Sequence, residues 1–125
     1  MFGSDTSASL TLPADNNVIR ALILESIMTF NLIYIILTTM HHTKNKIAYS
    51  VGLLAIGFTV GFNVILGGSV SGASMNPARS FGPALIVWNF GYQCIYWVTP
   101  ILGALIAAGL YMSLHKDLDL PSPST

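Results

Sequence analysis

Three long apolar segments constrain the fold of this chain more than any other feature. They run from about Val18 to Met40, from about Ile47 to Leu66 and from about Ile95 to Leu114. A helix needs about 20 mostly apolar residues to cross a bilayer, and each segment meets that length. Only 8% of the residues are charged, whereas a soluble domain usually carries about 25%. These features predict an all-α, multi-pass membrane protein with three transmembrane helices.

The basic residues predict how these helices are oriented. A short polar turn between the first two segments holds Lys44 and Lys46, and Lys116 follows the third segment. Basic residues are enriched on the cytoplasmic side of membrane proteins. Among them, only Arg20 lies near the opposite ends of the segments. We therefore expect the turn and the C-terminus to lie inside and the N-terminus to lie outside.

Small residues in the second and third segments predict close helix packing. Gly57 and Gly61 are four residues apart in the second segment, and Gly103 and Ala107 are four apart in the third. This spacing puts both members of a pair on one helix face, where they let two backbones approach. Such pairs are common in membrane helices and indicate no particular function.

The connection between the second and third segments, residues 67–94, is long but not hydrophilic. It combines apolar side chains with glycine and proline. Non-helical backbone is tolerated at membrane depth only where it is buried in protein or lines a watery cavity. We therefore predict a re-entrant loop here and expect it to carry the function. The predicted organisation, in chain order, is an outer N-terminal segment (1–17), transmembrane helices (18–40 and 47–66), the re-entrant loop (67–94), a transmembrane helix (95–114) and a cytoplasmic tail (115–125).

Asn76 and Pro77 predict the start of a short helix inside this loop. Asparagine is favoured just before a helix, and proline is favoured at its first position. Gly82 and Pro83 weaken the helix that follows, so we expect about nine residues, or about 14 Å, which is about half of a bilayer core. The N-terminus of such a half-helix would point to the midplane. Its partial positive charge would repel cations and oppose proton passage.

The residues on either side of this start also carry expectations. The stretch from Gly72 to Met75 should be extended and should expose backbone carbonyls to solutes in single file. Arg79 is an ionisable residue in an apolar region, where a charge is costly unless it meets water. Two alternatives are open for Arg79. It faces a watery cavity, or its side chain reaches the interface as a membrane anchor.

The run from Asn76 to Ala84 reads Asn-Pro-Ala-Arg-Ser-Phe-Gly-Pro-Ala. It resembles the second Asn-Pro-Ala box of the aquaporin (major intrinsic protein) family. The resemblance extends over about Leu12 to Leu114 and includes Glu25, the glycine-rich second segment and the Tyr96-Trp97 pair. It implies half of the family's inverted-repeat bundle, with three transmembrane helices and one re-entrant half-helix. The first box and its helices have no counterpart in this sequence, which makes a fragment or a truncated product the expectation.

The resemblance implies roles for individual residues around the pore centre. Asn76 would donate its amide hydrogens to solute, while Pro77 and Ala78 would shape the meeting point of two half-helices. The backbone that would line the pore belongs to Gly72, Ser74 and Met75. Glu25 matches a buried glutamate that holds the re-entrant backbone in place. The alternative for Glu25 is an acid inside a helix that pairs with Arg20 or with water.

The resemblance also implies a selectivity filter near the outer mouth. Arg79, Val64 and Ala73 fall at three filter positions. Strict water channels usually have histidine at the position of Val64, so this filter should be wider and less polar on that side. Similar filters occur in branches that pass ammonia, hydrogen peroxide or other small uncharged solutes. Ser80 follows Arg79, whereas glycerol channels typically have aspartate there.

The function that these features favour is passive transport of water and other small neutral solutes through a membrane channel. The implied partners are the lipid bilayer, the missing N-terminal half and further copies, since the family forms tetramers. The chain alone is not expected to form the family's pore, because the family's constriction needs half-helices from both faces and this chain supplies one. A lone half would also present Arg79 and Glu25 to lipid. One alternative is a non-conducting subunit that associates with a full-length aquaporin and modulates it. A second is a membrane-anchored structural protein.

Other classes of function find little support in the sequence. It has no visible nucleophile–base pair, metal cluster or phosphate-binding loop, so we expect no enzyme. Cys94 is the single cysteine and cannot form a Cys-based zinc site. We therefore expect no metal and no cofactor. The formal net charge of +0 provides no basic field for nucleic acid.

Overall fold

The computed structural model describes residues 10–13, 17–41 and 45–116. All regular structure in these residues is helical, and three of the helices are long and apolar enough to cross a membrane. The predicted all-α fold class is therefore confirmed. The helices in chain order are α1 (Val18–His41), α2 (Lys46–Ser71), α3 (Pro77–Val87) and α4 (Gln93–His115).

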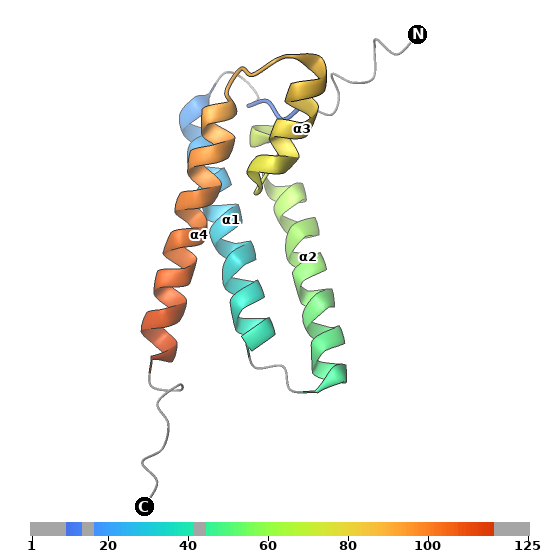
Figure 1. The fold of residues 1–125 in the computed structure, drawn as a ribbon, viewed down its shortest axis with the longest axis vertical. Helices are drawn as coiled ribbons and strands as arrows, with labels where there is room; N and C mark the ends of the chain where they lie inside the picture. Colours follow the sequence, from blue (N-terminus) through green and yellow to red (C-terminus); the bar gives the residue numbers. More distant parts are fainter. Residues whose placement is uncertain (1–9, 14–16, 42–44, 117–125) are drawn as a thin grey trace, which may run out of the picture.

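The four helices form a bundle in which α3 spans only one end (Figure 1). The helices α1 and α4 run in one direction along the bundle, and α2 and α3 run in the other. α1 packs against both α2 and α4, while α3 packs against α4. The chain doubles back after α2, so that α3 begins partway along the bundle and ends at the same side as α2 (Figure 1). This course places the loop between α2 and α3 inside the bundle.

The helix α2 continues to Ser71, past the end predicted at Leu66. Two of the glycines near its end serve packing and capping. A Cβ atom on Gly67 would lie 2.3 Å from the sulfur of Met28 in α1, so a larger residue would require the Met28 side chain to move. The helix stops at Gly72, whose backbone is left-handed with a φ of 83°. Glycine adopts this conformation without the steric cost that a Cβ brings.

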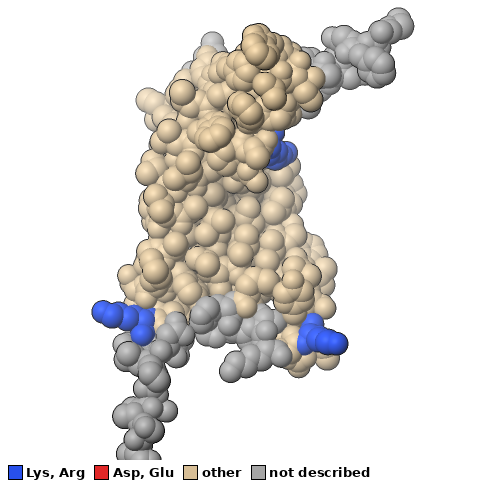
Figure 2. All heavy atoms as spheres, viewed as in Figure 1, with Lys and Arg blue, Asp and Glu red and all other residues tan. Residues whose placement is uncertain are grey.

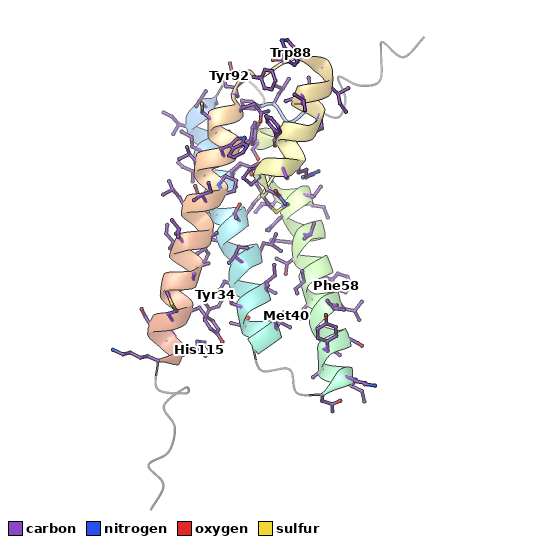
Figure 3. All side chains as sticks on the ribbon, in the orientation of Figure 1. Tyr34, Met40, Phe58, Trp88, Tyr92 and His115 are labelled. Atoms are coloured by element: carbon purple, nitrogen blue, oxygen red, sulfur yellow. The ribbon has the colours of Figure 1, made fainter. Side chains whose placement is uncertain are left out.

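The helix α3 has 11 residues, slightly more than the nine or so predicted, because it continues through Pro83 to Val87. At 1.5 Å per residue it is about 16 Å long, still about half of a bilayer core. It ends at Trp88, and the turn to α4 ends at Tyr92; both residues have left-handed backbone. Figure 3 shows these two aromatic side chains at one end of the bundle, with His115 at the other.

The helices α1 and α4 cross at Gly103 with their backbones in close contact. A Cβ atom there would lie 2.4 Å from the carbonyl oxygen of Ser26 and 3.0 Å from the backbone nitrogen of Phe30. Gly103 is therefore required for the approach of the two backbones, as its small-residue spacing predicted. The pair in α2 differs, because Cβ atoms on Gly57 and Gly61 would meet nothing within 4 Å.

The outward surface of the bundle is apolar over most of its length. Phe58 and Ile65 of α2 and Ile86 of α3 are among its most exposed large apolar side chains. Exposed apolar faces of this extent suit contact with lipid or with other protein segments. Lys46 begins α2 and Lys116 follows α4, so both lie at one end of the bundle (Figures 1 and 2). This placement is the one that the predicted orientation requires, although Lys44 lies outside the described residues.

We predict that Gly103→Ala weakens the α1–α4 contact. The new methyl group would clash with backbone atoms, which cannot move aside as a flexible side chain can, at a cost of about 1–3 kcal/mol. Thermal unfolding of the purified chain in detergent should therefore shift to lower temperature.

The matched control is Gly109→Ala, also in α4, where an added Cβ would meet nothing within 4 Å. This variant should be neutral or slightly stabilising, because alanine favours a helix over glycine by about 1 kcal/mol. Equal melting temperatures for the two variants would contradict the role assigned to Gly103.

Candidate functional site

The loop between α2 and α3 has an unusual backbone. The φ angles of Gly72, Ala73 and Met75 are 83°, 46° and 54°. The prediction that this stretch is extended was therefore wrong, since three of its residues lie in the left-handed region. Residues other than glycine adopt this region at a cost of about 1–2 kcal/mol each. Such a turn persists only where surrounding contacts hold it.

Glu25 of α1 provides those contacts. Its side chain is fully buried, and one carboxylate oxygen accepts hydrogen bonds from the Ser71 hydroxyl and the Ser74 backbone N–H, both at 2.8 Å. The other oxygen accepts from the Met75 backbone N–H, also at 2.8 Å. An ionised carboxylate only accepts hydrogen bonds, so three donors match its chemistry. The expectation that a lone half would expose Glu25 was therefore wrong, because the chain buries it without help.

A tyrosine in α4 holds the end of α2 from the other side. The hydroxyl of Tyr96 donates to the carbonyl of Ser71 at 2.6 Å, and the ring is fully buried. The Ser71 hydroxyl oxygen also accepts from the Ala73 N–H at 3.2 Å. Ser71 therefore links α1, α4 and the first residues of the loop.

Two serine hydroxyls tie the loop to α3. Ser74 donates to the carbonyl of Asn76 at 2.8 Å, and its oxygen is hydrogen-bonded to the Ser80 hydroxyl. Because Ser74 uses its single proton on Asn76, Ser80 is the donor of the second bond. Gln93 of α4 donates to the Ser80 carbonyl at 3.3 Å. Ser80 is fully buried within the bundle, and these bonds satisfy its polar groups.

Asn76 caps the N-terminus of α3. Its side-chain oxygen accepts from the Ala78 N–H at 2.9 Å, and its carbonyl accepts from the Arg79 N–H at 3.2 Å. Pro77 occupies the first helical position, where a missing N–H costs nothing. The cap uses the oxygen of the Asn76 amide, so the NH₂ group is the part left to donate to a solute. Asn76 is exposed and borders a cavity of about 250 Å³ together with Met75 and Pro77.

A second cavity, of about 560 Å³, borders the first residue of the loop, Gly72. Arg79 and Val64 both line it, together with Gly72. The Arg79 guanidinium donates to the carbonyl of Ala73. The structure thus brings Arg79 and Val64 to one cavity, whereas Ala73 is fully buried, does not line this cavity, and only holds the Arg79 side chain through its carbonyl. The wall of this cavity therefore combines the cationic side chain of Arg79, the apolar side chain of Val64 and the backbone of Gly72.

The sequence reasoning missed two contributors to the site. Residues 10–12 line the Arg79 cavity, although the N-terminal segment was expected to be only an outer loop. Thr11 is buried, and a Cβ atom on Gly72 would lie 2.6 Å from its methyl group. Asn63, just before Val64, is also buried and hydrogen-bonded to the loop. A lone asparagine in an apolar helix was the signal available for the second contributor; no pattern marked the first.

Comparison with known proteins agrees with this arrangement. Residues 3–111 match the family described as Major intrinsic protein. Over 109 residues the chain is 46% identical to Aquaporin TIP1-1 of Zea mays. The aligned region covers 85% of the chain and 44% of that relative. The chain is 43% identical over 109 residues to Probable aquaporin TIP1-1 of Oryza sativa subsp. japonica, with 85% and 44% covered.

A relative with a different subtype name gives a similar match. The chain is 44% identical over 93 residues to Probable aquaporin TIP3-2 of Arabidopsis thaliana, with 74% of the chain and 35% of the relative covered. The chain therefore spans less than half the length of these curated relatives. The family match nonetheless covers α1 to α4 almost entirely and includes the whole loop between α2 and α3. The chain belongs to the major intrinsic protein family, whose members are membrane channels and not enzymes.

Proposed function

We propose that this chain forms one half of an aquaporin-type channel for water and small neutral solutes such as ammonia and hydrogen peroxide. The observation that carries the proposal is the loop held by Glu25, which turns the chain back so that α3 begins inside the bundle. Asn76 stands at that start with its NH₂ group available to a passing solute. The names of the relatives, which are aquaporins or probable aquaporins, support the same function.

Two positive groups supply the barrier to cations in this proposal. The N-terminus of α3 carries about half a positive elementary charge from its aligned peptide dipoles. Arg79 adds a full charge at the cavity that it shares with Val64. Fixed positive charge in a narrow pore repels cations and protons but leaves neutral solutes free to pass. Water, ammonia and hydrogen peroxide are neutral, so this barrier does not exclude them.

The proposed filter discriminates among neutral solutes by its lining. Val64 contributes an apolar branched side chain, whereas Arg79, whose guanidinium donates to the Ala73 carbonyl, contributes a polar group. Such a lining suits a small solute that forms hydrogen bonds on one of its sides. Within the described residues, α3 is the one half-helix, so the second half-helix of the pore is proposed to come from another segment or chain.

A chimera tests the proposal. In it, this chain replaces the matching part of Aquaporin TIP1-1 from Zea mays, which then supplies the other half of the pore. Proteoliposomes containing the chimera should shrink in hyperosmotic buffer well above the rate of empty vesicles. Asn76→Asp in the chimera should abolish the excess, because it replaces the NH₂ donor with an anionic acceptor.

Two outcomes would count against the proposal that this chain is one half of such a channel. A chimera that inserts normally but shrinks at the empty-vesicle rate would instead favour a non-conducting subunit. Proteoliposomes containing this chain alone serve as the second control and should also shrink at the empty-vesicle rate. Rapid shrinkage there, blocked by Asn76→Asp, would show that one half-helix suffices.

We also predict that Val64→His in the chimera narrows the solute range. Histidine is larger and polar, so it should obstruct hydrogen peroxide more than water. One added group in a binding pocket changes discrimination by about tenfold, and the peroxide-to-water permeability ratio should fall to that extent. Stopped-flow light scattering gives water permeability, and an encapsulated peroxide-sensitive dye gives peroxide entry. Equal loss of both would mean that Val64 is not part of the filter.

A further inference from the structure

Asn63 is a polar residue inside an apolar transmembrane helix. It lies in α2, one residue before Val64, and only 1% of its surface is exposed. A buried amide is costly unless its donors and acceptors find partners. The partners of Asn63 therefore reveal why α2 carries an amide at this depth.

The Asn63 amide connects three segments of the chain. Its nitrogen donates to the carbonyl of Met28 in α1 at 2.9 Å and to the sulfur of Met75 in the loop at 3.3 Å. Its oxygen accepts from the Asn31 amide of α1 at 3.2 Å. Both N–H donors are thus used, and the side chain links α2 to α1 and to the loop at the same time.

Met75 is the residue through which this contact reaches the pore. Its backbone is left-handed, its N–H donates to Glu25, and it directly precedes Asn76. The Met75 side chain lies in a buried apolar cluster with Met28 and Ala73. Glu25 therefore fixes the main chain of Met75, and Asn63 fixes its side chain. A residue held at both points cannot rotate without moving the cap of α3.

The same contact sets the rotation of α2. Successive residues on a helix point about 100° apart, since there are 3.6 residues per turn. With Asn63 bonded toward α1 and the loop, the next side chain, Val64, is turned toward the cavity that Arg79 lines. A different rotation of α2 would carry Val64 away from this cavity.

We propose that Asn63 is a positioning residue of the channel. It holds Met75, and through it the Asn76 cap, while setting the direction of Val64. The structural part of this inference depends only on the contacts of the chain, and its effect on permeation rests on the proposed function.

Hydrogen exchange of the full chain in lipid nanodiscs tests the inference without any flux measurement. The Ser74 and Met75 amides are bonded to Glu25, so their exchange reports opening of the loop. Asn63→Leu keeps the size of the side chain but removes both donors. Exchange at Ser74 and Met75 should rise by about 5- to 10-fold, while exchange across α4 should stay unchanged.

Two matched controls separate positioning from general stability. Asn31→Leu removes the bond to the Asn63 oxygen and leaves both Asn63 donors in use, so loop exchange should change by less than about twofold. Thr59→Val removes a hydroxyl in α2 that bonds only within its own helix, to the Ala55 carbonyl at 2.8 Å. It should leave loop exchange unchanged.

A second variant keeps the test decisive if Asn63→Leu does not fold. Met75→Leu removes only the sulfur acceptor and should raise loop exchange by about threefold or less, because sulfur is a weak acceptor. Unchanged loop exchange in both Asn63→Leu and Met75→Leu would overturn the proposal. So would an equal rise over all four helices in Asn63→Leu, because that would mark a loss of overall stability. In the chimera, Asn63→Leu should also lower the water flux at normal insertion. That result would show that the Asn63 contacts affect permeation.

Discussion

A buried carboxylate that receives three hydrogen bonds lies at the centre of this chain. Glu25 is the only acidic residue among those that the structure describes, and its partners come from the end of α2 and from the loop. The loop needs this support because Ala73 and Met75 have left-handed backbone. The support in turn decides where α3 starts and where its positive end points. The candidate pore thus depends on one side chain of α1.

The positively charged side chains lie in two different surroundings. Lys46 and Lys116 lie at one end of the bundle, where lipid headgroups and water would meet them. Arg79 lies in the first turn of α3, and its guanidinium reaches a backbone carbonyl and a cavity. The turn that Glu25 holds presents this carbonyl, that of Ala73, to the guanidinium. One carboxyl side chain in α1 therefore supports both the start of α3 and the carbonyl that Arg79 contacts.

Local signals in the sequence predicted most of the fold. The lengths of the apolar segments were sufficient for α1, α2 and α4, and the Asn76-Pro77 pair was sufficient for the start of α3. The end of α2 was not predictable in this way. Gly67 reads as a helix breaker in isolation, and only its contact with Met28, distant in sequence, makes it a packing residue.

The site was less predictable than the fold for the same reason. Nothing in the sequence near Ala73 or Met75 marks a left-handed turn, because its stabilisation comes from Glu25, about 50 residues away. The resemblance to the aquaporin family identified Arg79 and Val64, and the structure brings them to one cavity. Asn63 went unnoticed, because an asparagine in an apolar helix has many conceivable partners until the fold selects them.

The most direct test of this account is the water permeability of the chimera with Glu25→Gln. Glutamine keeps the shape of the side chain but replaces one acceptor oxygen with a donor, which leaves a buried N–H of the loop unpaired at a cost of about 1–3 kcal/mol. A loss of that size shifts a conformational equilibrium by about tenfold, so permeability per inserted molecule should fall to a similar extent. The neighbouring variant Ser26→Ala, which removes only a bond within α1 to the Leu22 carbonyl, should retain full permeability. Wild-type permeability in Glu25→Gln would contradict the central role of the carboxylate.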